Sequence, residues 1–206
     1  MSLAASDLAL YSLALLILFL TPGPVWLALV ARAVSGGFNS AWPLALGVAV
    51  GDVVWPLLAI LGLSWITSEY EGTLTVLRWV ACLFFLWLGW SVIRHADTPI
   101  STDNRMTRPG MVAGFLAGVV AILGNPKAIL FYLGVLPGFF DLSAATKADI
   151  ALICALSVLV PLIGNLCLAW FIGRIRDHIT SPKALRRLNL TAGGLLICVG
   201  LVLPFT

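Results

Sequence analysis

The chain has 206 residues, of which 61% are hydrophobic and only 10% are charged, and its formal net charge is +3. A soluble domain carries about 25% charged residues, so this composition excludes an ordinary soluble protein. The small net charge gives no indication of nucleic-acid binding. The sequence is therefore that of an integral membrane protein with little room for a soluble domain.

Six apolar segments are long enough to cross a bilayer, which takes about 20 helical residues. They cover roughly residues 8–31, 40–66, 74–93, 111–139, 150–172 and 188–205. Their hydrophobicity is continuous rather than alternating, which favours helices over barrel strands. The sequence predicts an all-α membrane protein of six transmembrane helices in one domain, 1–206, with a first half 1–94, a linker 95–110 and a second half 111–206.

The basic residues predict the orientation. With six helices, the connections after the first, third and fifth lie on one side and hold Arg32, Arg94, Arg105, Arg108, Arg174, Arg176, Lys183, Arg186 and Arg187. The opposite side holds only Arg78 and Lys147. The positive-inside rule places the basic side in the cytoplasm. We therefore expect the inner (plasma) membrane as the location, with both termini in the periplasm.

The first and fourth segments are each interrupted. The interruptions are Thr21-Pro22-Gly23-Pro24 and Gly124-Asn125-Pro126-Lys127. Thr21 and Asn125 are helix N-cap residue types, and Pro22 and Pro126 suit the first helical position. Proline also breaks the hydrogen bonds of a preceding helix. We expect helices 1 and 4 to be broken into half-helices, with new N-termini near their middles.

The direction of the two broken helices suggests a repeat. The first and fourth segments cross in opposite directions, so both new N-termini lie near the bilayer centre, where they attract anionic groups. The second and fifth segments also correspond, since Gly51-Asp52 with Pro56 matches Gly164-Asn165 with Pro161. Broken helices in an inverted repeat are typical of secondary transporters. The sequence thus predicts an inverted 3+3 repeat.

Asp52 and Lys127 are the charged side chains set deepest in apolar segments. Charges at this depth are costly and usually mark a substrate or ion pathway. On the functional interpretation, Lys127 and the half-helix ends hold a carboxylate, while Asp52 holds an ammonium group or carries a proton. The alternative is a structural Asp52–Lys127 ion pair without a ligand. Trp55, close to one helical turn beyond Asp52, is a candidate pocket wall.

The predicted substrate and proton pathway combines these features. Its candidate residues are Asp52, Lys127, Thr21, Pro22, Gly23, Pro24, Asn125, Pro126, Asn165 and Trp55. Two further patterns, Gly47-x-x-x-Gly51 and Gly114-x-x-x-Gly118, permit close helix approach. They are compatible with packing inside the chain and with a homodimer, and the sequence does not decide between the two.

Enzyme motifs are absent from the sequence. It has no H-E-x-x-H zinc site, no second intramembrane acid for an aspartyl dyad and no phosphate-binding glycine loop. The four cysteines form no C-x-x-C and no cluster with histidine, so we expect neither a metal nor another cofactor. The expected partners are a zwitterionic small molecule, protons and the lipid bilayer.

Several stretches together resemble the LysE/RhtB amino acid exporters, which include lysine, homoserine/threonine and leucine efflux proteins. They are Thr21-Pro22-Gly23-Pro24, Ala45-Leu46-Gly47-Val48-Ala49-Val50-Gly51-Asp52, Leu86-Trp87-Leu88-Gly89-Trp90 and Gly124-Asn125-Pro126-Lys127-Ala128 with Phe131-Tyr132. The resemblance implies an inner-membrane exporter of amino acids or closely related metabolites, driven by the proton gradient. The family commonly has Asn where this chain has Val25, and Trp26 beside it could narrow the pocket.

Two other functions stay open at this point. One is another transport class, a small-cation or metal efflux protein or a different broken-helix transporter. A cation carrier is expected to have several acids at the midplane and no lysine, whereas this sequence has one of each. The other is a scaffold that transports nothing.

Overall fold

The computed structural model describes residues 3–69, 73–94, 96, 110–142, 144–175 and eight residues between 186 and 201. All regular structure within these residues is helical. Most of the predicted linker 95–110 and of the predicted sixth helix 188–205 lies outside the described residues. The all-helical prediction is confirmed for the described part, and the count of six helices stays a prediction.

The first apolar segment is broken, as predicted. Helix α1 spans Ala5–Leu20, and α2 spans Pro24–Glu69 over 46 residues. Inside α2 the backbone of Gly37 is non-helical, with φ 68° and ψ −167°. That positive φ is a conformation which glycine adopts at little cost. Gly37 therefore divides α2 into a short helix that follows α1 and a long helix that returns across the molecule.

The fourth apolar segment is broken too. Helix α4 spans Met111–Leu123 and is followed by α5, Pro126–Leu130, by the π-helix η1, Phe131–Val135, and by α6, Leu136–Phe139. The direction of the chain bends by 48° at the break. The carbonyl oxygen of the Asn125 side chain accepts a hydrogen bond from the Lys127 backbone N–H at 3.2 Å, so Asn125 caps α5 as predicted.

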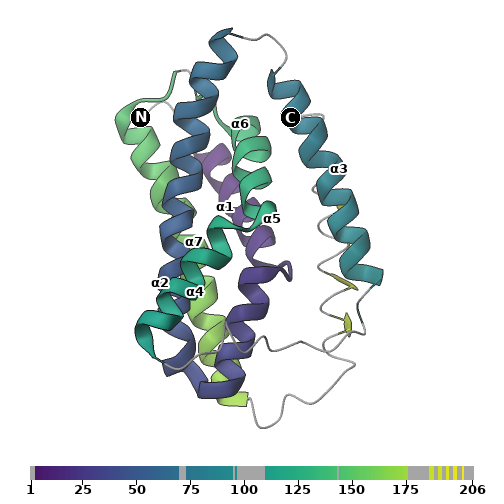
Figure 1. Cartoon of the computed structure of the whole chain (residues 1–206). Helices are drawn as coiled ribbons and strands as arrows, with labels where there is room; N and C mark the ends of the chain where they lie inside the picture. Colours follow the sequence, from purple (N-terminus) through teal and green to yellow (C-terminus); the bar gives the residue numbers. More distant parts are fainter. Residues whose placement is uncertain are drawn as a thin grey trace.

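Two more helices complete the described part, α3 over Thr73–Arg94 and α7 over Lys147–Ile175. Figure 1 shows α2 beside α7 and α4, with α3 at the edge of the bundle against η1. The segment Pro24–Gly62 of α2 and the whole of α7 are each long and apolar enough to cross a membrane. The bent pair of α4 with α5–α6 adds a third span if it is counted as one.

The outer surface is apolar. More than half of the surface of Leu61, Trp87, Val112 and Ile163 is exposed, on α2, α3, α4 and α7 respectively. A soluble monomer rarely exposes so much contiguous apolar surface, whereas a bilayer solvates it. The structure is therefore that of an integral membrane protein.

The glycine patterns pack α2 on α4 within the chain. A Cβ atom built on Gly47 would collide with the Phe115 carbonyl oxygen, and one on Gly118 would collide with that of Leu44. The two backbones thus lie in direct contact, as small residues allow in membrane helices. Of the two interpretations left open by the sequence, the structure gives these glycines the role of internal packing.

Arg32 joins the Gly37 turn to the start of α4. Its Nε atom donates to the Ser40 carbonyl at 2.6 Å, and Nη2 donates to the Gly110 carbonyl at 3.2 Å. The side chain is only 1% exposed. A buried charge needs such hydrogen bonds to offset its lost hydration. Arg32 therefore connects the two halves of the chain at the predicted cytoplasmic end.

Candidate functional site

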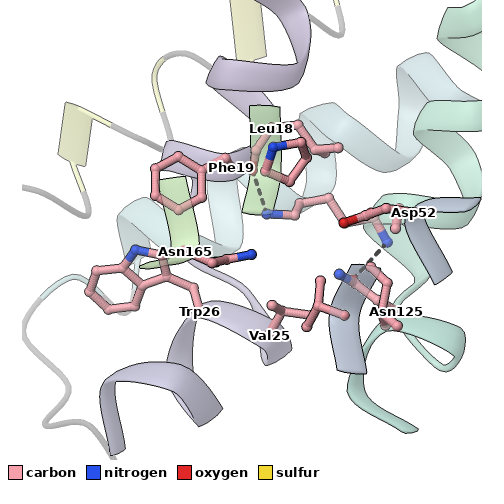
Figure 2. A pocket seen from close by; sticks show the side chains of 12 residues that line it. Leu18, Phe19, Val25, Trp26, Asp52, Asn125 and Asn165 are labelled. Atoms are coloured by element: carbon pink, nitrogen blue, oxygen red, sulfur yellow. Dashed lines mark hydrogen bonds between the residues drawn. The ribbon is translucent and has the colours of Figure 1, made fainter. Parts of the chain in front are cut away.

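A cavity lies where the two helix breaks meet, as Figure 2 shows. It is lined by Leu18, Phe19, Val25, Trp26, Val48, Asp52, Ile122, Asn125, Lys127, Ala128, Pro161 and Asn165. Its empty volume is about 420 Å³, including the part that opens outward. Four polar side chains face eight apolar residues around it.

The lining residues occupy matching positions in the two halves. Val48 and Asp52 lie one turn apart on α2, and Pro161 and Asn165 have the same spacing on α7. The first residues after the starting prolines of α2 and α5 also correspond, because Val25-Trp26 and Lys127-Ala128 both line the cavity.

Two glycine contacts repeat in the same manner. A Cβ atom on Gly51 would collide with Ile122, and one on Gly164 would collide with Phe19. Ile122 and Phe19 are each the second-last residue of a helix, α4 and α1. The contact of α2 with α4 therefore has the same local form as the contact of α7 with α1.

Asp52 has one free carboxylate oxygen. The side chain is 3% exposed, and Oδ1 accepts a hydrogen bond from the Tyr132 hydroxyl at 3.3 Å. Oδ2 is buried and has no hydrogen-bond partner among the described residues. An unpaired buried carboxylate oxygen is costly. Asp52 therefore has one carboxylate oxygen that no hydrogen bond from the described residues satisfies.

Lys127 lines the cavity but is held by the other helix break. Its Nζ atom donates to the Leu18 carbonyl at 2.9 Å and to the Thr21 carbonyl at 2.7 Å. Carbonyls at a helix C-terminus have no partner within the helix and carry partial negative charge. A Cβ atom on Gly23 would lie 3.3 Å from Nζ, so this glycine gives the ammonium group room.

Among the residues that it describes, the structure does not show the Asp52–Lys127 ion pair that the sequence left open as an alternative. No Asp52–Lys127 ion pair forms in the described part of the chain, because the ammonium group is bonded to the end of α1. An ammonium group has three N–H donors, and two of them are used here. The third N–H has no hydrogen-bond partner among the described residues.

The prediction that Thr21 and Pro22 begin the second half-helix was wrong. The Thr21 hydroxyl donates to the Ile17 carbonyl at 2.7 Å, so Thr21 ends α1. Helix α2 begins instead at Pro24. The physical reason is the second proline, which disfavours helical backbone in the residue before it, Gly23. None of the four residues from Thr21 to Pro24 lines the cavity.

Of the remaining candidates, Asn125 and Asn165 line the cavity and Trp55 does not. Asn165 is 3% exposed, and its side chain points into the cavity in Figure 2. The Trp55 indole N–H donates to the Ile122 carbonyl at 3.2 Å. Trp55 therefore supplies a donor to the last turn of α4 at the break, rather than forming a wall of the cavity.

Three buried polar residues behind Asp52 were missed as site residues. Tyr132, Ser157 and Tyr11 are each 0% exposed. Besides Asp52, the Tyr132 hydroxyl lies 3.5 Å from the Ser157 carbonyl, and the Ser157 and Tyr11 hydroxyls lie 2.6 Å apart. One signal in the sequence was available, since Pro161 lies four residues after Ser157 and cannot bond its carbonyl.

Comparison with known proteins identifies the family. Residues 16–205 match the family described as LysE type translocator. The chain belongs to this family. The match covers both helix breaks and every residue of the cavity, and it confirms the resemblance seen in the sequence.

Relatives of this LysE type translocator include characterised and uncharacterised proteins. A Synechocystis membrane protein described as uncharacterized is 31% identical over 92% of this chain and 91% of its own length. A leucine efflux protein of Klebsiella pneumoniae is 27% identical over 72% of this chain and 70% of its own. A leucine efflux protein of Salmonella choleraesuis is 27% identical over 73% and 76%. No solved structure matches the chain.

Proposed function

We propose that this LysE type translocator exports amino acids with apolar side chains, or closely related small metabolites, from the cell in exchange for protons. The observation that carries the proposal is the cavity at the two helix breaks, where one buried carboxylate has an oxygen without a hydrogen-bond partner among the described residues. Leucine efflux proteins among the relatives support the substrate class. The apolar part of the lining supports it as well.

The cavity suggests how a zwitterion would lie. Its ammonium group would bond to Asp52 Oδ2, and its carboxylate would face the Asn125 and Asn165 amides and the third N–H of Lys127. An apolar side chain would then lie against the remaining lining residues, among them Val25 and Trp26. Burial of apolar surface contributes about 25 cal/mol per Å², so this contact would favour a leucine-like side chain.

Asp52 would couple export to protons by holding one cation at a time. The substrate ammonium occupies the carboxylate during export, and a proton occupies it on the return. Each state neutralises the Asp52 carboxylate with one positive charge, so no uncompensated charge is buried while the protein changes conformation.

The matching lining positions and glycine contacts support an inverted repeat of three plus three helices. In such a transporter one half moves against the other around a site at the midplane. We propose this motion here, in the inner membrane, with both termini in the periplasm as the basic residues predict.

A tolerance screen tests the substrate class. A sensitive bacterial host expressing the chain is supplied with single amino acids or their dipeptides at growth-inhibiting concentrations. We expect tolerance to leucine-like residues with the wild type, none with Asp52→Asn, and full tolerance with the control Asp7→Asn, which removes a carboxylate at the start of α1. Equal tolerance with and without the chain for every compound would contradict the proposal.

A further inference from the structure

The Tyr132 hydroxyl is the only group seen to hold the Asp52 carboxylate among the described residues. It lies 3.3 Å from Asp52 Oδ1 and 3.5 Å from the Ser157 carbonyl oxygen. A phenol has one proton to donate and can also accept a hydrogen bond. Tyr132 can therefore donate to only one of these two oxygens at a time.

The Ser157 carbonyl is available because of a proline. In an α-helix the carbonyl of residue i bonds to the N–H of residue i+4, and here that residue is Pro161, which has none. The Ser157 hydroxyl is engaged elsewhere, since it donates to the Ile153 carbonyl at 2.8 Å and pairs with Tyr11. The free carbonyl thus gives Tyr132 a second acceptor.

We propose that Tyr132 is a positioning residue that holds the Asp52 carboxyl group in both of its protonation states. When Asp52 is ionised, Tyr132 donates to Oδ1. When Asp52 is protonated, its O–H donates to the Tyr132 oxygen, and the Tyr132 proton turns to the Ser157 carbonyl. No proton leaves the pair when the Tyr132 hydroxyl turns, and Oδ2 takes no part in the Tyr132 hydrogen bond in either state.

Other titratable groups surround this pair on the packed elements. They are Tyr11 on α1, which pairs with Ser157, and Lys127 on α5, which lines the same cavity as Asp52; the packed helices α3 and α7 also carry Cys82 and Cys154, and α4 carries no titratable group. Lys127 is held by the end of α1, and Tyr11 is held by Ser157. The proposal rests on the proposed function in one respect, that Asp52 is the group which alternates between a proton and the substrate.

Infrared difference spectroscopy of the purified protein without substrate tests the proposal directly. Changing the pH should reveal a carboxylic acid C=O band of Asp52, identified by its loss in Asp52→Asn. In Tyr132→Phe the band should shift to higher frequency, because the carboxyl group loses its hydrogen bond. The matched control is Tyr11→Phe, which removes another buried hydroxyl and should leave the band in place.

A second variant tests the role of the free carbonyl without touching either partner. Pro161→Ala supplies an N–H to the Ser157 carbonyl, so Tyr132 retains only Asp52 as its acceptor. The band should then shift to lower frequency, because the C=O group now accepts the bond. An unshifted band in Tyr132→Phe, an equal shift in Tyr11→Phe, or no effect of Pro161→Ala would each overturn the proposal.

Binding of leucine gives an independent measurement. As a single substitution, Tyr132→Phe should raise the Kd for leucine roughly tenfold, which corresponds to the loss of one hydrogen bond to a charged group. Added to Asp52→Asn, Tyr132→Phe should not change the Kd for leucine further, because Tyr132 acts through Asp52. Equal losses in both backgrounds would refute this route. If the wild type binds no leucine, the proposed substrate class fails while the infrared result still decides the role of Tyr132.

Discussion

Replacing Lys127 by methionine should destabilise the fold, in addition to removing a proposed contact of the substrate carboxylate. Methionine keeps an unbranched side chain, one atom shorter, but removes the N–H groups that bond to the Leu18 and Thr21 carbonyls. A hydrogen bond to a charged group contributes about 1.5–3 kcal/mol, so the two together contribute about 3–6 kcal/mol. Methionine recovers part of this because no ammonium group is then buried.

We therefore expect a net loss of about 2–4 kcal/mol. For a chain of this length, that lowers the thermal midpoint by roughly 5–15 °C. The assay is thermal unfolding in detergent, followed by tryptophan fluorescence or by size-exclusion after heating. The control is Lys147→Met, an exposed lysine at the start of α7, which should shift the midpoint little. A Lys127→Met protein as stable as the control would refute the assignment of Lys127 to the end of α1.

Three further outcomes follow from the packing and the charge distribution. Gly118→Ala should lower the free energy of unfolding by about 1–3 kcal/mol, because the new Cβ atom meets the Leu44 carbonyl. Its control, Gly62→Ala, faces open space and should raise the free energy of unfolding by about 0.5–1 kcal/mol. Equal midpoints of the two variants in thermal unfolding would contradict the close contact of α2 and α4. Trp55→Phe should cost about 1 kcal/mol in the same assay by removing the indole donor of the Ile122 carbonyl, which then keeps only backbone N–H donors from the end of α4, and no loss would argue against that bond. A reporter fused after Thr206 should be active only if it works in the periplasm, and activity of a cytoplasmic reporter would overturn the predicted topology.

The sequence predicted the features that depend on local chemistry. Both interruptions combine proline with an N-cap residue type, as in Thr21-Pro22 and Asn125-Pro126, and so were visible, whereas the prolines inside α2 and α7 do not end those helices. The depth of Asp52 and Lys127 followed from counting apolar residues, and both line the cavity. The cap by Asn125 also followed from residue type, whereas that by Thr21 failed because Pro24 competes with Pro22 for the start of the helix.

The contacts between distant segments could not be predicted in this way. Every residue has a backbone carbonyl, so nothing in the sequence indicated that Lys127 would bond to Leu18 and Thr21. Tyr132 was not distinguished from a core aromatic residue, because a single hydroxyl hardly changes the hydrophobic pattern. The glycine patterns indicated close approach, but the partner of each glycine depends on which helices pack together.

The central claim is that Asp52 exchanges a substrate ammonium group for a proton. The most direct measurement uses liposomes that contain the purified protein and a leucine-like substrate, with an imposed pH gradient. The wild type should move substrate against its concentration gradient, whereas Asp52→Asn, similar in shape but unable to titrate, should catalyse at most exchange or downhill movement. Gradient-driven uphill transport by Asp52→Asn at the rate of the wild type would contradict the account.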